Sequence, residues 1–430
     1  MMTRARFSAL ALLLGVCCLG HTSAFAQYAP PPAGYGGPGP GYAPGPGYCP
    51  PGATFETPEP ISADPMYGDA YCAEASVNRF GPLVTTDGAF LRADYLNWNT
   101  KSEKYQLLGA PVANNENPAV PFTFLAPGTT TPIGFGSVPT NNGIDLSGQN
   151  GIRVTGGVSF INGGSIEASA FFLGRRQSGF TIPLGQPVQT TTLLFGIFPI
   201  PGPVVPNSMA TSTLFNGQVS DHLFIYNQSF TETVLSQLWG GDITYFMDYD
   251  IAGPLQLRPL IGARYINFTE RLTQVGVFAD PFLGTPPFAS TIQSLAINNL
   301  WGAQVGFRSS FVTKWVEIGV TPKLLLLGNT MVSTVRSNQF RSTFDPPSEQ
   351  TDVTNKFTFG SDLEGYATLN LTPSFSLRAG YNFMWFNTVS RPTRNIVYDD
   401  RGPAVPVIGE KTFFQSVIIH GASFGAELRF

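Results

Sequence analysis

The sequence is poor in charge: Asp, Glu, Lys and Arg make up 12% of its 430 residues, about half the share of a soluble globular protein. It also lacks the repeated apolar runs of about 20 residues that a bundle of transmembrane helices needs. Aromatic residues, by contrast, reach 13%, with 35 Phe and 15 Tyr, and they are diluted by Gly, Ser, Thr and Asn. This combination is typical of a membrane β-barrel, whose strands carry lipid-facing and lumen-facing residues alternately.

Histidine and cysteine are scarce as well, at three and four residues. Residues 1–26 have the three parts of a secretory signal peptide: the basic residues Arg4 and Arg6, the apolar stretch 7–19, and an A-x-A cleavage site at 24–26. A membrane anchor is the alternative, and it is disfavoured because the apolar stretch is short. The mature chain keeps 22 basic and 28 acidic residues, which gives no reason to expect a nucleic-acid partner.

Cleavage of the signal removes two of the four cysteines. A lipoprotein site at Cys17 or Cys18 is disfavoured because a valine precedes them. Cys49 and Cys72 remain, and two alternatives stay open: a disulfide between them, and free or intermolecular thiols. With no histidine near either cysteine in the sequence, we expect no metal site and no cofactor.

Residues 27–88 are rich in Pro, Gly and Tyr, and include the stretch YAPPPAGYGGPGPGYAPGPGYCPPG from Tyr28 onward. Such a composition cannot build a hydrophobic core, and its prolines favour extended polyproline II conformation. We therefore predict a disordered periplasmic linker. A soluble spacer is the favoured role, and binding of the tyrosines to a partner such as cell-wall polymer is the alternative.

Residues 89–430 show period-two alternation, which predicts β-strands. The connections alternate between very short and very long, and the short ones carry the Gly, Asn, Asp and Pro that tight turns need. Short periplasmic turns and long outer loops are typical of outer-membrane barrels, and an even strand number places both termini in the periplasm. The ten predicted strands are 89–101, 150–162, 165–178, 234–250, 255–273, 295–311, 315–331, 354–371, 374–391 and 411–430.

The charges of these strands fall on one face: Arg264, for example, alternates with Ala263 and Tyr265. A charge on the lipid-facing side would cost about 2–4 kcal/mol at mid-membrane, so that face must be charge-free. A soluble β-sandwich would carry far more charge on its solvent face. The predicted lumen-facing charges are Arg92, Asp94, Arg153, Glu167, Asp242, Arg258, Arg264, Arg308, Glu317, Lys323, Asp362, Glu364, Arg378, Glu427 and Arg429.

The chain ends in a strand with alternating apolar residues, Phe424, Ala426, Leu428 and Phe430. This resembles the terminal signal by which outer-membrane proteins are handed to the barrel-assembly machinery. An ordinary amphipathic strand that ends in Phe is the alternative. The expected partners are therefore outer-membrane lipid and the barrel-assembly machinery.

Four segments, FLRADYL at 90–96, LIGARY at 260–265, LRAGY at 377–381 and HGASFG at 420–425, resemble the bacterial beta-barrel porin-7 family. The resemblance covers residues 88–430 and includes the long Gly/Pro-rich lead. It implies an all-β, transmembrane, antiparallel up-and-down barrel in the bacterial outer membrane. The name porin rests on shape, so the resemblance brings no ligand or activity.

The two histidines that remain after cleavage give little support to an enzyme. His420 has a lipid-facing parity at the outer headgroup level, but Ala422 stands where a lipase site of that kind would place Ser. His222 follows Asp221 in the longest outer loop, where omptin-like proteases place Asp and His pairs, and a solvated loop histidine is the favoured interpretation. There is no P-loop, dinucleotide fingerprint or zinc spacing. We predict a non-enzymatic protein, with a protease or lipase as the exception.

The predicted lumen holds eight basic and seven acidic residues, a balance that favours a paired network over a filter of one sign. Barrels of about eight strands are filled by side chains and those of 16–18 leave an aqueous channel, so ten strands lie near the filled end. The first functional hypothesis is a porin-like protein with a narrow or gated passive channel. The second is a non-enzymatic surface or envelope-structural barrel whose outer loops bind a partner, and an outer-membrane hydrolase is third. The oligomeric state stays open.

Overall fold

The computed structural model describes residues 88–103, 106–112, 120–126, 128–160, 163–194, 197–247, 254–280 and 286–430. All of these belong to one compact unit, Ser76–Phe430. The predicted signal peptide, residues 27–87 of the predicted linker, and the cysteines Cys49 and Cys72 lie outside the described residues. Among the residues that are described, no helix is long and apolar enough to cross a membrane.

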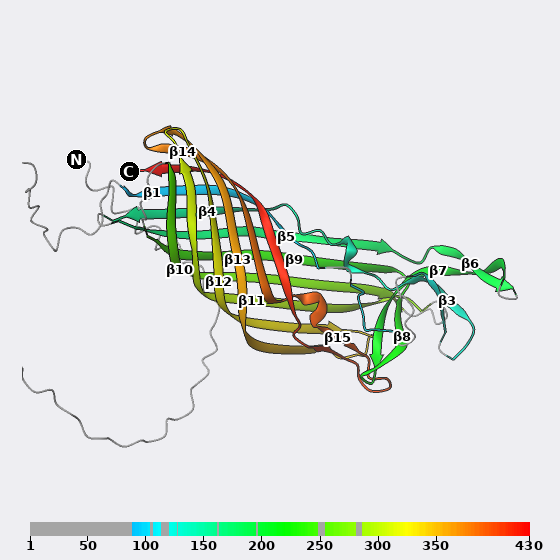
Figure 1. Cartoon of the computed structure of the whole chain (residues 1–430). Helices are drawn as coiled ribbons and strands as arrows, with labels where there is room; N and C mark the ends of the chain where they lie inside the picture. The colour runs from blue at the N-terminus through cyan, green and yellow to red at the C-terminus, as the bar shows by residue number, and fades with distance from the viewer. Residues whose placement is uncertain are drawn as a thin grey trace, which may run out of the picture. The chain divides into compact units, whose positions relative to one another are not determined.

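Ten antiparallel strands close into a barrel in which each strand pairs with its neighbours along the chain (Figure 1). The barrel closes where β1 pairs with β17, from Phe90 opposite Arg429 to Thr100 opposite Ile419. The prediction of an all-β, ten-stranded, up-and-down barrel is confirmed. The barrel strands are β1 (Phe90–Thr100), β4 (Gln149–Ser159), β5 (Ser165–Pro183), β9 (Ser229–Phe246), β10 (Leu255–Phe278), β11 (Phe288–Val312), β12 (Val316–Asn338), β13 (Ser348–Thr372), β14 (Phe375–Ser390) and β17 (Phe414–Arg429).

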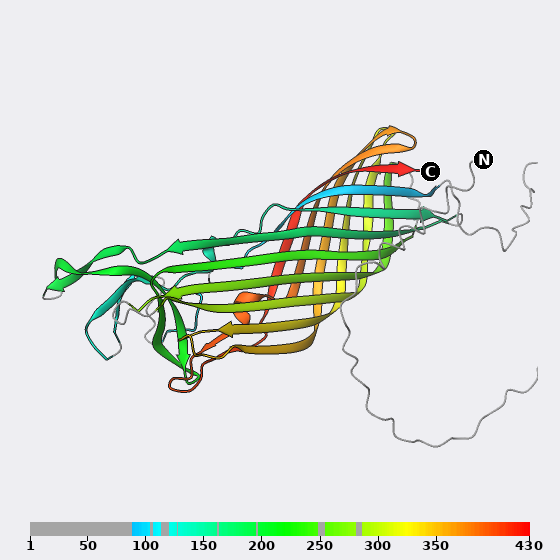
Figure 2. The ribbon, with the colours of Figure 1, turned by 180° about the vertical axis from the view of Figure 1, so that it is seen from behind.

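Short connections join the strands at one end of the barrel, which we call the short-turn end. In the connection between β4 and β5, Gly163 and Gly164 have φ angles of +86° and +92°, a backbone conformation that favours glycine. A Cβ atom at Gly164 would also come within 2.9 Å of the Phe246 carbonyl oxygen. The first residues of β1 and the last of β17 lie at this same end (Figures 1 and 2).

The connections at the opposite end, which we call the mouth, are long and contain strands that the sequence analysis did not predict. They form a second sheet, the loop sheet, in the order β16-β15-β7-β3-β2, and β6 and β8 pair with β7. Prolines interrupt the strand-like runs of Thr, Val and Phe in β6 and β7, and this hides them in the sequence. These elements are β2 (Phe122–Leu125), β3 (Pro132–Ser137), β6 (Pro187–Leu194), β7 (Phe198–Phe215), β8 (Gln218–Tyr226), β15 (Ile396–Asp399) and β16 (Val407–Glu410), with the 3-10 helices η2 (Asn141–Gly143) and η3 (Pro392–Asn395).

The barrel wall is uneven in height. β1 and β4 have 11 residues each, about one tilted membrane crossing, whereas β11 and β13 have 25 each. The long strands extend toward the mouth beyond their predicted ends (Figures 1 and 2), and β10 runs to Phe278 rather than to 273. Beyond the membrane the outer face no longer needs to be apolar, so the alternation that marks a strand in the sequence fades there.

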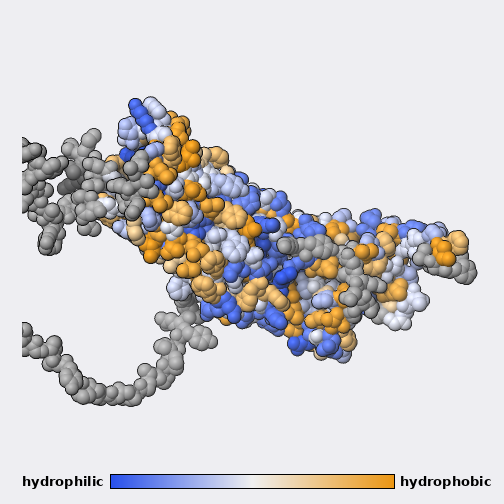
Figure 3. Space-filling model, viewed as in Figure 1, coloured by the Kyte–Doolittle hydropathy of each residue, from blue (hydrophilic) through white to orange (hydrophobic). Residues whose placement is uncertain are grey.

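The outer face of the wall is apolar from the short turns up to a level marked by aromatic residues. Trp301 is 63% exposed, and Trp239 packs on Tyr265 with ring centroids 5.3 Å apart. Just beyond this level, outward-facing amides replace the apolar side chains, as in the 2.8 Å hydrogen bond from Asn267 to Asn299. Figure 3 shows apolar surface over the wall near the short turns. We take the wall between the short turns and the Tyr265 level as the membrane-spanning part.

Candidate functional site: the barrel lumen

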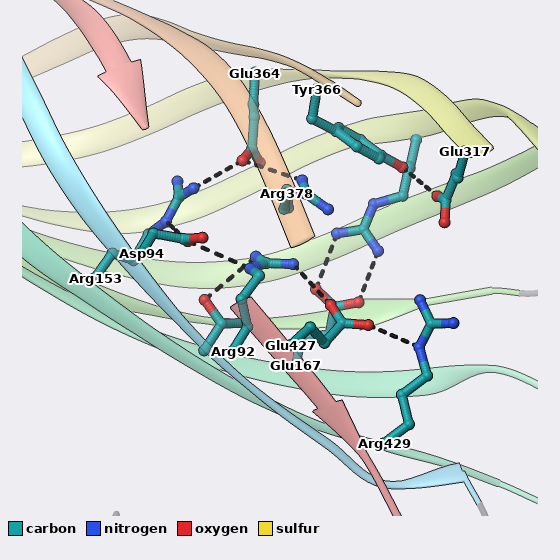
Figure 4. A network of polar contacts seen from close by, with 12 residues as sticks. Arg92, Asp94, Arg153, Glu167, Glu317, Glu364, Tyr366, Arg378, Glu427 and Arg429 are labelled. Carbon is teal, nitrogen blue, oxygen red and sulfur yellow. Dashed lines mark hydrogen bonds and ion pairs between the residues drawn. The ribbon is translucent and has the colours of Figure 1, made fainter. Parts of the chain in front are cut away.

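An ion-pair network occupies the lumen of the membrane-spanning part (Figure 4). Glu364 on β13 lies between Arg153 on β4 and Arg378 on β14, with N–O distances of 2.9 and 3.1 Å. Asp94 on β1 lies in the same way between Arg153 and Arg92, at 2.9 and 3.3 Å. Three strands separate β4 from β13 around the barrel. The Arg153–Glu364 pair therefore reaches across the interior and joins distant parts of the wall.

Two further pairs cross the lumen beside this network. Arg308 on β11 donates two hydrogen bonds to Glu167 on β5, at 2.7 and 2.9 Å. Arg264 on β10 lies 2.6 Å from Asp362 on β13 and 3.4 Å from Asp242 on β9. We call these buried ion pairs together the charged layer. Positive and negative side chains alternate through it. A layer of this kind stabilises the barrel geometry and carries no excess of one sign with which to select ions.

The structure buries ten of the fifteen side chains that were predicted to face the lumen, and leaves five half-buried. Of the half-buried ones, Arg258 donates to Ser165 at 2.7 Å, and Glu317 accepts a 2.8 Å hydrogen bond from the Tyr366 hydroxyl. The ten buried side chains are Arg92, Asp94, Arg153, Glu167, Asp242, Arg264, Asp362, Glu364, Arg378 and Glu427. The half-buried ones are Arg258, Arg308, Glu317, Lys323 and Arg429.

A cavity of about 30 Å³ lies within the charged layer, and Arg153, Lys323 and Glu364 are among the residues that line it. This volume is enough for about two water molecules. A hydrated ion or a nutrient needs a continuous path that is much wider. The charged layer is therefore closed in this structure. Of the sixteen residues that line its cavity, ten are charged or amide-bearing, three are aromatic and three carry a hydroxyl group.

An apolar layer lies between the charged layer and the mouth. Its residues continue the parity of the charges: Leu96 and Trp98 follow Asp94 along β1, and Phe171 follows Glu167 along β5. All fifteen members are at most 5% exposed, and they come from eight of the ten barrel strands. Side chains of the wall itself thus close the lumen a second time. The members are Leu96, Trp98, Phe171, Leu173, Leu238, Ile266, Phe268, Leu300, Leu325, Leu327, Met384, Phe386, Val389, Val417 and Ile419.

The sequence analysis missed the apolar layer because it assigned only charged residues to the lumen. The signal was present in the leucine run 324–327. Leu325 and Leu327, which share the parity of Lys323, are fully buried, whereas Leu324 and Leu326 are more than a third exposed. A strand that is apolar on both faces predicts a filled lumen at that height, and this inference needs no structure.

Two chain segments fold into the mouth above the apolar layer: the described residues 101–103 and 106–112 after β1, and residues 391–413 after β14. We call them the mouth segments. Arg391 donates two hydrogen bonds to Glu270 on β10, at 2.6 and 2.8 Å, and a third to the Lys101 carbonyl oxygen at 2.9 Å. Its guanidinium also lies 3.8 Å from Glu103. One buried arginine therefore fastens both mouth segments to the wall.

A buried carboxyl group without a partner lies on the wall of the mouth. Glu232 on β9 is 0% exposed, and among the described residues neither of its carboxyl oxygens has a hydrogen-bond partner. It stands seven residues beyond Trp239, outside the membrane-spanning part. Burial raises the pKa of Glu232 to about 8, and the negative charge of Glu103 contributes in the same direction. This carboxyl group is therefore mostly protonated at neutral pH.

The histidines occupy defined positions. The His222 side chain is 43% exposed, and it also has contacts that the sequence did not indicate: its Nδ1 atom bonds to Asp400, and its ring packs edge-on against Phe215 and Phe224. The tertiary fold brings Asp400 there from a distant loop, which the sequence could not show. His420 bonds through Nδ1 to the Tyr381 hydroxyl at 2.6 Å. Within the described ranges, no serine, threonine or cysteine side chain is hydrogen-bonded to either imidazole.

The terminal strand exposes alternate side chains to the outside. Phe424, Leu428 and Phe430 are 57%, 46% and 63% exposed, and Ala426 between them is half-buried. β17 pairs with β1 on one side and β14 on the other.

In the part of the chain that is described, no group of His, Cys, Asp and Glu side chains is arranged to hold a metal ion.

A closed antiparallel barrel with an apolar outer belt and a polar lumen defines an outer-membrane β-barrel protein. A family model described as "Putative beta barrel porin-7 (BBP7)" matches residues 90–430. The chain therefore belongs to this family, as its sequence resemblance predicted. A search of curated proteins finds no match.

Three solved structures that resemble this chain share little sequence identity with it. The outer membrane protease OmpT of Escherichia coli is 8% identical, with a TM-score of 0.38, over 82% of this chain and 99% of that one. A FadL homologue of Pseudomonas aeruginosa is 10% identical, with a TM-score of 0.19, over 80% and 90%. The P. putida toluene transporter TodX is 8% identical, with a TM-score of 0.19, over 80% and 91%. These likenesses are too weak to bear on function.

Proposed function

We propose that this protein is a sealed outer-membrane barrel that holds the loop sheet at the cell surface. The apolar layer carries the proposal, because fifteen buried side chains close the lumen between the charged layer and the mouth. An ion that crossed a packed apolar layer would have to lose its hydration shell, which is very costly. The role is then that of a non-enzymatic surface or envelope-structural barrel, the second of the sequence hypotheses.

The proposal includes an orientation. The short-turn end faces the periplasm and the mouth faces outward, which agrees with the usual placement of short turns and long loops in bacterial barrels. Both ends of the barrel chain then lie on the periplasmic side, next to the predicted linker. Outer-membrane lipid, the barrel-assembly machinery and, through the linker, cell-wall polymer are the expected partners.

A gated passive channel is the second candidate, and the mouth segments favour it. They are held mainly by side-chain contacts such as Arg391–Glu270 and by backbone hydrogen bonds to the loop sheet, such as that from Ala110 to Ser212. Their movement would therefore leave the paired strands of the barrel wall in place. The apolar layer, however, consists of wall side chains. Release of the mouth segments alone would leave it in place. An outer-membrane hydrolase is third. The His222–Asp400 contact is an Asp–His pair of the kind that the protease alternative requires, but the imidazole is packed edge-on against Phe215 and Phe224.

Conductance in planar lipid bilayers separates the first two candidates. The folded full chain should show no steady conductance, and neither should a variant in which residues 393–409 are replaced by a short Gly-Ser linker. Incorporation is checked by heat-modifiable migration of the recovered protein. A large steady conductance from the natural chain would refute the sealed barrel, and conductance from the loop-replaced variant alone would establish the gated channel.

A further inference from the structure

Among the residues that the structure describes, three buried carboxyl groups in the mouth share one buried cation. Glu103, Glu232 and Glu270 are all buried there, and Arg391 is the guanidinium that contacts them. Arg391 bonds to Glu270 through two nitrogen atoms and approaches Glu103 at 3.8 Å. Glu232 receives no such contact. If all three carboxyl groups were ionised, two negative charges would remain without a cation in a water-poor space.

The neighbours of Glu232 on the wall offer no cation either. On β10, Gln274 stands in register with Glu232. On β5, Phe180 stands in register on the other side. The nearest inward cation of β5 is Arg176, but it is in register with Ser236, four residues further along β9.

Two titratable side chains in the mouth interact with Glu232: one is a carboxylate and the other is a neutral phenol. The mouth segment after β1 contributes the Glu103 carboxylate, whose charge acts on Glu232. β15 contributes the buried Tyr398 phenol, which donates to Gln274 at 3.3 Å and whose pKa is raised by burial and by the charge of Glu232. Glu232 is therefore compatible with the closed mouth only in its neutral, protonated form.

We propose that Glu232 is a proton-controlled latch: its neutral carboxyl group lets the mouth segments pack into the mouth, and its ionisation expels them. The anion would need water or a cation, but Glu232 is shielded from solvent in the closed mouth and no described cation contacts it. Opening supplies water to Glu232 and separates it from Glu103, so the open form binds the proton more weakly. The closed form is thus favoured at low pH. This inference does not depend on whether the barrel conducts.

The sign of the pH dependence follows from proton linkage. In the open form the carboxyl group titrates near its ordinary pKa of 4.5, and in the closed form near 8. Between these values the closed form binds one more proton, so the opening equilibrium constant rises up to about tenfold per pH unit. Below about pH 4.5 and above about pH 8 the two forms bind equal numbers of protons. The equilibrium then no longer changes with pH.

Hydrogen exchange of the folded full chain in detergent measures this equilibrium directly. Peptides from residues 391–413 report on the mouth, where the Lys411 amide donates to the Asn395 carbonyl oxygen at 3.0 Å. After correction for the intrinsic exchange rate, protection of these amides should fall by up to about tenfold per pH unit from about pH 5 to 8 and then level off. Amides in the β1–β17 pair serve as the internal control and should keep constant protection.

Two variants and one matched control complete the test. Glu232→Gln, which is isosteric and cannot ionise, should make protection of residues 391–413 independent of pH. Glu103→Gln should keep the slope but reach the plateau at a lower pH. Glu349→Gln, an exposed glutamate in β13, should behave as the natural chain. The proposal is overturned if the natural chain shows no pH dependence, or if Glu232→Gln retains it. The natural chain alone decides the first point even where the glutamine variant fails to fold.

Discussion

At the scale of single residues, a charged side chain is tolerated in the lumen, where it has a partner, and is destabilising on the lipid face. Glu364 is tolerated inside the membrane-spanning part because Arg153 and Arg378 both lie within 3.1 Å of it. Removal of one partner of such a buried pair costs about 3–5 kcal/mol, since the other charge is left buried. The strands β17 and β1 also approach each other too closely for a larger residue at 425: a Cβ atom at Gly425 would come within 2.5 Å of the Ala93 carbonyl oxygen. Glycine there lets β17 approach β1 at the level of Asp94.

The lipid-facing rule can be tested on β10, where parity decides the environment. Ile261 faces outward near mid-membrane, between the short turn before Leu255 and the Tyr265 level. Ile261→Arg would place a cation in hydrocarbon and should lower the free energy of unfolding by about 2–4 kcal/mol. The matched control is Thr269→Arg, on the same face of the same strand but beyond the aromatic level, which should cost about 0–1 kcal/mol. Urea unfolding in lipid vesicles measures both, and equal losses would show that the assigned register is wrong.

At the scale of elements, the strand that closes the barrel must pair with two neighbours. β17 is the last strand of the chain and pairs with both β14 and β1, so the barrel remains open until it docks. Its outward side chains at 424, 428 and 430 are exposed to the surroundings of the barrel rather than to its core. They are therefore available for recognition before and during closure. This supports the sequence prediction of an assembly signal, which stays a prediction.

Loss of the terminal aromatic residue should impair insertion into the membrane. Deletion of Phe430, or Phe430→Lys, should reduce the amount of heat-modifiable barrel in outer membranes several-fold, because the assembly machinery no longer recognises the strand end. Deletion of residues 30–60 is the comparison and should leave insertion intact. Fractionation followed by gel migration without heating gives both measurements. A larger defect from the 30–60 deletion would contradict the division at residue 88.

At the scale of the whole molecule, three layers are stacked along the barrel axis. The charged layer lies within the membrane-spanning part, the apolar layer follows toward the mouth, and the mouth segments with the loop sheet complete the stack. Each layer joins strands that are far apart in the chain, so the closed barrel gains contacts that no pair of neighbouring strands could make. Such a barrel should be stable and cooperative in its unfolding.

The location of the whole molecule is tested by fractionation. The protein should separate with outer membranes, and the unheated sample should migrate faster on gels than the heated one, because a closed barrel with a packed lumen resists detergent. A point variant that opens the charged layer, Glu364→Ala, should lower the temperature at which migration changes by several degrees. Recovery of the natural chain as a soluble periplasmic protein would refute the membrane assignment.

Much of this fold could be predicted because a membrane wall constrains sequence strongly. Each lipid-facing residue must be apolar and each charge must point inward, so parity at Arg264 or Arg378 identifies a strand and its face. Outside the membrane the outer face of a strand need not be apolar, and the strand limits were not predicted there. β10 and β11 extend beyond their predicted limits, and β6–β8 were not predicted. Ten of the charged side chains that the sequence predicts to face the lumen are buried, but the apolar layer beside them was not predicted, because only charged residues were assigned to the lumen.

The sequence by itself determined the number of barrel strands, their alternation and the short-turn end, because these depend on local parity and on turn residues. Only the tertiary structure decided which charges pair across the lumen, since Arg153 and Glu364 are 211 residues apart. It also decided that His222 meets Asp400, and that no described cation contacts the buried Glu232. These facts depend on which strands face each other after closure, and no property of a single strand encodes that.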